Sequence, residues 1–425
     1  MGRHSGESEC PPPWRRYLRG RRWDRWLLAL YVVTVLAIVL HQGAVGVDNN
    51  FTIFRAAFRH LAAGQDLYAD YPSEQGDEFK YSPTFALLFA PFSRTPVLVA
   101  LLLWNSLNAL LLFYAVRRLL PGRDGTIALA LVYLEVVRAT QRAQANALVA
   151  ALMILGYLAL ERRRQLAGVL AIALGTFVKI FPIAALALAI FHARRVRVAL
   201  AFAAAIVAGA ALPLLVTSPS HLAAQYARWY AIEGRDAFAS AQGGGGAGLY
   251  GGVMYQLRLW LGVQWPNWPI QLVGLIVQLA PLARRQHWSD PDFRLRYLCS
   301  LLVFVVIFNH QVESPSFVIA VTGIAVWFAS SARRPLDVAL MALTLLIVSV
   351  SSTELVPHWL QRDVFVKYRL KTVPCALVWL VMQAELLGLR RRSHRPGGGE
   401  NPQADVGAPY GSTATSDASA WPGWR

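Results

Sequence analysis

The sequence predicts an all-α, polytopic integral membrane protein with a bundle of about 12 transmembrane helices (range about 10–13). Two observations lead to this prediction. Of the 425 residues, 56% are apolar and only 15% are charged, whereas a soluble protein of ordinary composition carries about a quarter charged residues. The apolar residues also form repeated runs separated by short arginine clusters, which is the hydropathy pattern of a membrane bundle.

The arginine clusters set the expected topology. If every cluster faces the cytoplasm, each interval between two clusters crosses the membrane twice. Both termini are then cytoplasmic, and the unusual polar segments gather on the non-cytoplasmic side of a multi-pass protein of the cell (inner) membrane. The clusters lie within residues 117–123, 162–164, 194–197, 284–285, 333–334 and 390–392.

The net charge of +17 does not predict a nucleic-acid-binding protein. The basic residues punctuate the apolar runs and do not line one polar face with interleaved aromatic side chains. The three cysteines, Cys10, Cys299 and Cys375, have no ligand-like spacing. We therefore expect no nucleic acid partner, no metal site and no cofactor.

The chain divides into three expected parts. Residues 1–25 form a basic cytoplasmic tail, and residues 26–390 form the membrane-embedded domain. Residues 391–425 are rich in Gly, Pro and Ser and are expected to be a disordered cytoplasmic tail. Within the middle part, the expected outer loops are residues 48–95, 217–266 and 352–372.

The first outer loop combines polar residues with an amphipathic pattern. Asp48 follows the first span, and in the segment NNFTIFRAAFRHL, Phe51, Phe54, Phe58 and Leu61 recur at helical spacing. This spacing predicts an amphipathic helix on the membrane surface. The loop is longer than a connection requires, which favours a structured, functional segment.

A lysine lies within the short apolar segment 165–193. The segment has about 29 residues, too few for two full spans, so we expect a pair of short or broken helices. Lys179 lies between the two halves, and a lysine at such a depth costs about 2.5–3.5 kcal/mol. Either its side chain extends to the interface, or it binds a partner, for which a phosphate is suited.

Five segments follow one another along the chain: NNFTIFRAAFRHLAAGQDLY, KYSPTFALLFAPF, QANALVAALMILGYLAL, RRRQLAGVLAIALGTFVKIFP and GGVMYQLRLWLG. In this order they resemble glycosyltransferase family 87, a family of GT-C type membrane α-mannosyltransferases that use polyprenyl-phosphate sugars. The resemblance covers roughly residues 26–390. It implies an inverting hexosyltransferase (EC 2.4 class), with a polyprenyl-phosphate-linked sugar, a lipid or glycan acceptor and membrane lipids as partners.

The resemblance also implies an acidic general base in the first outer loop. The aspartate that is usual in the family falls on Asn50, which cannot accept a proton. Asp48 is the nearest carboxylate, and its position at the end of a span gives a partly desolvated environment that suits a base. Asp48 is therefore the expected catalytic base, with Asp77 and Glu78 as alternatives.

The donor phosphate and the acceptor are expected to contact polar residues at the same membrane face. A rival interpretation is a transporter or flippase for a lipid-linked or small anionic substrate, although the sequence shows no convincing internal repeat. The expected binding residues are Asn49, Asn50, Lys80, Tyr81, Gln144, Asn146, Lys179 and His310.

Overall fold

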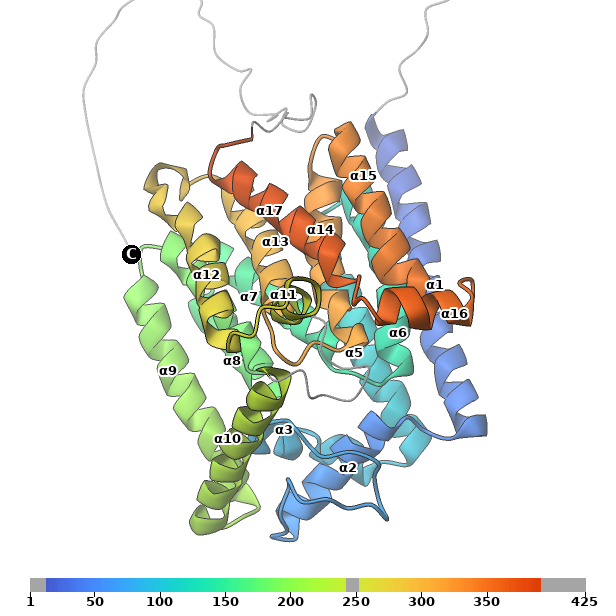
Figure 1. Ribbon diagram of the computed structural model, residues 1–425, viewed down its shortest axis with the longest axis vertical. Helices are drawn as coiled ribbons and strands as arrows, with labels where there is room; N and C mark the ends of the chain where they lie inside the picture. The colour runs from blue at the N-terminus through green and yellow to red at the C-terminus, as the bar shows by residue number, and fades with distance from the viewer. Residues whose placement is uncertain (1–12, 242–251, 391–425) are drawn as a thin grey trace, which may run out of the picture.

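The computed structural model describes residues 13–241 and 252–390, and within these ranges every regular element is a helix (Figure 1). The all-α fold class is confirmed. The expected disordered tail, residues 391–425, lies outside the described residues, as do residues 1–12.

Four helical segments are long and apolar enough to cross a membrane, and shorter apolar helices accompany them. The four are α1 (Pro13–Val45) from Arg22 onward, α5 (Val97–Leu119), α9 (Arg195–Ala211) with η2 (Leu212–Leu215), and α15 (Pro335–Thr344) with η6 (Leu345–Ser349) and η7 (Val350–Ser352). The shorter ones are α7 (Asn146–Glu161), α8 (Gln165–Val178), η1 (Phe181–Phe191), α12 (Asn267–Leu279) with η3 (Ala280–Ala283), η5 (Ser314–Ser316) with α14 (Phe317–Ser330), and α17 (Thr372–Leu386).

The protein is thus a multi-pass membrane bundle, while the number of crossings stays a prediction. Two further helices, α6 (Arg123–Gln141) and α13 (Pro291–Ile307), belong to the same bundle, although each carries several charged residues. Residues 13–25, which were expected as part of the basic tail, form the first turns of α1. The division of the chain into two tails and a membrane-embedded domain stays a prediction.

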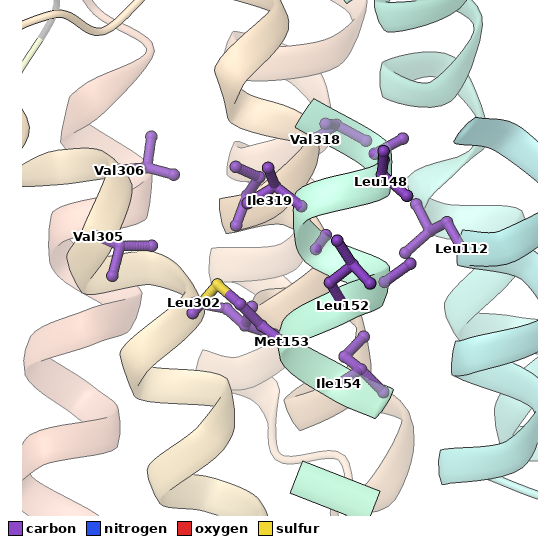
Figure 2. Packing of buried hydrophobic residues seen from close by; sticks show 14 of the residues in the cluster. Leu112, Leu148, Leu152, Met153, Ile154, Leu302, Val305, Val306, Val318 and Ile319 are labelled. Carbon is purple, nitrogen blue, oxygen red and sulfur yellow. The ribbon is translucent and has the colours of Figure 1, made fainter. Parts of the chain in front are cut away.

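The centre of the bundle is α7, which packs against α5, α8 and α14. Figure 2 shows Leu148, Leu152 and Met153 of α7 among side chains of α5, α13 and α14, and all three are buried. On the side of α8 the backbones approach closely, since a Cβ added at Gly168 would lie 3.2 Å from the carbonyl oxygen of Gly156. Small residues allow such close contact between membrane helices.

The short hairpin expected at 165–193 is formed by α8 and η1, which have 14 and 11 residues. The chain breaks between them because Pro182 lacks an N–H and restricts the residue before it. Lys179 takes an extended backbone conformation, with φ −147° and ψ 143°, and its N–H ends α8 by donating to Gly175. The break therefore leaves the Lys179 side chain at an end of the bundle.

One end of the bundle is closed by ion pairs between helix termini. Asp24 of α1 lies 2.5 Å from Arg117 of α5, and Glu161 of α7 lies 2.8 Å from Arg294 of α13. Two carboxylates, Asp337 and Glu385, bind the C-terminal Arg390 of the described chain. Arg117 and Arg390 come from two of the clusters that were expected to face the cytoplasm, and the side of the membrane that they face stays a prediction.

The opposite end carries the expected outer loops, which are largely helical. In Figure 1, α2, α3 and α10 gather there, below the bundle. The predicted amphipathic helix exists as α2, and Phe51, Phe54, Phe58 and Leu61 are all buried. Its apolar face was expected on the membrane surface, but Phe51, Phe54 and Leu61 pack into the core of the protein. The loop helices are α2 (Asn49–Ala62), α3 (Pro83–Leu88), α4 (Ala90–Arg94), α10 (Pro219–Ala241), α11 (Val253–Leu261), α16 (His358–Leu360) and η8 (Gln361–Val366).

The side of the membrane that each end faces is testable by cysteine labelling. In a Cys10→Ser background, where the remaining Cys299 and Cys375 are buried, we expect Asp70→Cys to react with an impermeant maleimide in intact cells. Asp70 is exposed at the α2 end, and Arg162 is exposed at the other end. We expect Arg162→Cys to react only after permeabilisation. The reverse pattern would contradict the topology.

Candidate active site

A cavity of about 420 Å³ lies at the α2 end of the bundle. Its walls come from α2, the segment before α3, the break between α8 and η1, α10, α12 and the end of α13. Five carboxylates and two lysines are among its described lining residues, together with several aromatic and aliphatic side chains. A volume of a few hundred Å³ with convergent polar groups is typical of a small-molecule site.

Lys179 is the cation of the cavity that no carboxylate neutralises directly. In the described part of the chain, no Asp or Glu oxygen lies within 4.0 Å of its ammonium group. Its Nζ is 5.6 Å from the ring centroid of Tyr81, a distance that allows a cation–π contact. The other lysine differs, because Lys80 lies 3.0 Å from Asp236.

The carboxylates of the cavity differ in whether a cation, an amide or neither lies next to them. Glu78 is paired with Arg235, and Asp236 with Lys80. Glu313 accepts a hydrogen bond of 3.0 Å from the amide of Gln144, and Gln144 in turn accepts one of 3.2 Å from Tyr81. Asp77 is exposed, and no cation in the described ranges lies within 4.0 Å of it.

Glu233 is a carboxylate in an environment suited to proton transfer. It projects into the cavity from α10, and no Lys or Arg nitrogen of the described chain lies within 4.0 Å of it. Burial raises the pKa of Glu233 to about 7, and the neighbouring charge of Asp236 acts in the same direction. The lysines Lys179 and Lys80 act against this shift. A carboxylate with a pKa near neutrality can both accept and release a proton.

Most of the residues expected from the sequence line this cavity. His310 is among them, and burial lowers its pKa, so that the neutral imidazole is favoured. The others are Asn50, Asp77, Glu78, Lys80, Tyr81, Gln144 and Lys179.

Three expected residues do not line the cavity, and Asp48 is the important one. Its carboxylate caps α2 by accepting from the backbone N–H of Asn50 at 3.0 Å, and it lies 3.6 Å from Arg142. Asn49 instead accepts from the N–H of Gly76. Asn146 is completely buried at the start of α7. The geometry therefore gives Asp48 a structural role and does not support it as the base.

Several cavity residues were missed from the sequence, among them Trp229, Glu233, Asp236 and Glu313. Trp229, Glu233 and Asp236 are spaced i, i+4 and i+7, so they share one face of α10. That spacing was a usable signal, but the segment was taken for a loop. Glu313 had no signal, because only folding brings it to Gln144, 169 residues away in sequence.

A family model described as glycosyltransferase family 87 matches residues 79–308, which is more than half of the chain. The chain belongs to glycosyltransferase family 87. The matched segment includes Lys80, Tyr81, Gln144, Lys179 and Glu233, so most of the cavity lies inside it. This family 87 member is therefore a membrane glycosyltransferase.

Two similar solved structures are of ArnT from Cupriavidus metallidurans. The one bound to undecaprenyl phosphate is 15% identical, with 85% of this chain and 78% of that chain covered and a TM-score of 0.33. The apo structure is also 15% identical, with coverages of 85% and 77% and a TM-score of 0.36. No curated protein is similar enough to count as a match. At this distance the solved structures support no argument about individual residues of the family 87 chain.

The capping role of Asp48 predicts a difference between two substitutions. Asp48→Ala removes the acceptor for the N–H of Asn50 and should lower the free energy of unfolding by about 1 kcal/mol. Asp48→Asn keeps a capping oxygen and should change it by less than about 0.5 kcal/mol. Thermal unfolding of the purified variants measures both. An equal loss of unfolding free energy in Asp48→Ala and Asp48→Asn would mean that the charge near Arg142 stabilises the protein and the helix cap does not.

Proposed function

We propose that this protein transfers a hexose, with mannose as the first candidate, from a polyprenyl-phosphate donor to a lipid or glycan acceptor on the non-cytoplasmic face. The observation that carries the proposal is the ammonium group of Lys179, which faces the cavity without a directly paired carboxylate. A half-buried ammonium group of this kind favours a bound anion, and phosphate suits a compact ammonium group.

The walls of the cavity support a donor with an apolar tail. Ile180 and Leu275 line the cavity and yet are 44% and 42% exposed, so the cavity adjoins an apolar outer surface. In a membrane bundle such a surface faces hydrocarbon. A polyprenyl chain can therefore remain in the lipid while its phosphate reaches Lys179.

Glu233 is the proposed general base, in place of Asp48. The acceptor hydroxyl attacks the anomeric carbon, its proton passes to the carboxylate of Glu233, and the bond between that carbon and the phosphate oxygen breaks. The polyprenyl phosphate leaves with the electron pair of that bond, and a single displacement inverts the anomeric configuration. Lys179 stabilises the negative charge that develops on the leaving phosphate.

The remaining polar residues suit the sugar and the acceptor. Tyr81, Gln144 and Glu313 form a hydrogen-bonded series across the cavity, and each has a polar group that can bind a hydroxyl. Asn50 lines the cavity and holds its side-chain amide on Asp48 and the carbonyl oxygen of Arg142. Asn50 is therefore a proposed positioning residue.

Transport of a lipid-linked or small anionic substrate is the alternative function. An assay of the purified protein in detergent separates the two, because detergent micelles have no compartments. Transfer of radiolabelled sugar from a polyprenyl-phospho-sugar to an extracted lipid acceptor supports the transferase. Binding of the donor without any transfer, in the presence of acceptors from the native membrane, would favour transport.

Lys179→Met tests the phosphate contact. Because the variant removes the charge but keeps an unbranched side chain, we expect kcat/KM for the donor to fall by about 100-fold or more. A steady-state transfer assay at varied donor concentration measures this. Lys367→Met is the matched control, since Lys367 is exposed and does not line the cavity. An unchanged kcat/KM for the donor in Lys179→Met would show that Lys179 does not contact the donor.

Glu233→Gln tests the base through the pH dependence. A base must be deprotonated, so with a pKa of about 7 transfer should fall about tenfold for each pH unit below that value and level off above it. Glu233→Gln should lower kcat by about 10²–10⁴-fold and remove this dependence.

If Glu233 is not the base, three further variants can locate it. Their transfer rates are measured beside that of Glu233→Gln; the variants are Asp77→Asn, Glu78→Gln and Asp48→Asn. We expect Asp48→Asn to retain most of the activity, because its side chain lies outside the cavity. A loss of activity confined to Asp77→Asn or Glu78→Gln would return the base to the first outer loop.

A further inference from the structure

We propose that a second cavity binds the phosphate headgroup of an anionic lipid. This cavity, of about 150 Å³, lies between the segment that follows α13, the end of the α15 helix and the segment before α17. It shares no lining residue with the 420 Å³ cavity of the candidate active site, here called the donor cavity. The proposal therefore goes beyond the transfer reaction.

The polar lining of the second cavity consists of cations, hydroxyls and one amide. Lys371 and Arg369 line it, and none of its lining residues in the described chain is an Asp or a Glu. This composition contrasts with the donor cavity, where five carboxylates are present. A group of cations and hydrogen-bond donors without a carboxylate favours an anionic ligand. The hydroxyl and amide residues are Ser314, Ser351, Ser352, Gln361 and Thr372.

A buried hydroxyl that has no hydrogen-bond partner among the described residues indicates where the ligand would bind. Thr372 is the first residue of α17, it is only 1% exposed, and its Oγ1 has no hydrogen-bond partner among the described residues. A buried hydroxyl without a partner in the protein can accept a hydrogen bond from a molecule in the cavity or donate one to it. The ammonium group of the adjacent Lys371 donates to Ser314 at 2.6 Å, which holds it at the same cavity.

The nearby buried carboxylate is already neutralised. Glu135 acts on Lys371 electrostatically, but it lies 2.6 Å from Arg138, which also donates to the carbonyl oxygens of Val348 and Ser349. Burial lowers the pKa of Lys371 to about 7, and with Lys371 protonated the set of Glu135, Arg138 and Lys371 carries a net positive charge. An anion in the second cavity would balance it.

The surroundings of the second cavity distinguish a lipid phosphate from a free anion. Val366 lines the cavity and is exposed, and Leu346, Leu355 and Trp359 are large apolar side chains exposed nearby in the sequence. Exposed tryptophan and aliphatic residues at the end of a span are typical of the boundary between headgroups and acyl chains. A phosphate that carries acyl chains would satisfy both the charged cavity and this surface.

Calorimetric titration of the full-length protein in neutral detergent tests the proposal. The probes are dihexanoylphosphatidic acid, dihexanoylphosphatidylcholine and inorganic phosphate. We expect saturable binding of the phosphatidic acid and at least about tenfold weaker binding of the other two. Equal binding of inorganic phosphate would overturn the assignment to a lipid, and equal binding of the phosphatidylcholine would overturn the assignment to an anion.

Three variants locate the site. Thr372→Val removes only the hydroxyl, and Lys371→Gln removes the charge. Each should weaken the binding of the phosphatidic acid by at least about tenfold. Lys367→Gln makes the same charge change on an exposed side chain outside the cavity and should bind as the wild type does. Wild-type affinity in Thr372→Val, whose unfolding temperature is checked in parallel, would overturn the proposal. The titration requires no sugar transfer, so its outcome is independent of the donor cavity.

Discussion

The arrangement of the candidate active site depends on the break between α8 and η1. Two short helices cannot each cross a membrane, so their junction must lie where protein or water satisfies the free backbone groups. Pro182 maintains the break, and Lys179 next to it becomes a cation at the wall of a cavity. The charges of Glu313 and Glu233 and the ring of Tyr81 offset part of the cost of placing an ammonium group there. A bound anion would offset more of it, which favours a phosphate-bearing donor.

The two ends of the bundle use charge differently. At one end, arginines pair with carboxylates across helix termini, as Arg117 does with Asp24 and Arg294 with Glu161. Such pairs fix the helices and leave little charge for a ligand. At the α2 end two carboxylates of the cavity are also paired with cations. Glu233, however, faces the cavity without a directly paired cation, which favours chemistry at this end.

Much of the fold was predictable because hydrophobic runs of the length of a helix have few alternatives in a membrane. The broken hairpin and the buried face of α2 followed from length and spacing alone. The site was only partly predictable. Lys179 was identifiable because a charge in an apolar segment is costly, but Asp48 was assigned by proximity to Asn50, whereas helix capping determines its contacts. The spacing of Glu233 with Trp229 and Asp236 indicated a shared helix face, but only the packing of α10 shows that this face lines the cavity.

The proposed contact between Lys179 and the donor phosphate is tested most directly by an experimental structure of the protein with a bound polyprenyl phosphate. We expect a phosphate oxygen about 2.7–2.9 Å from Nζ of Lys179, with the prenyl chain leaving past Ile180 and Leu275. A phosphate bound elsewhere, with Lys179 paired to Glu233 or Glu313, would contradict it.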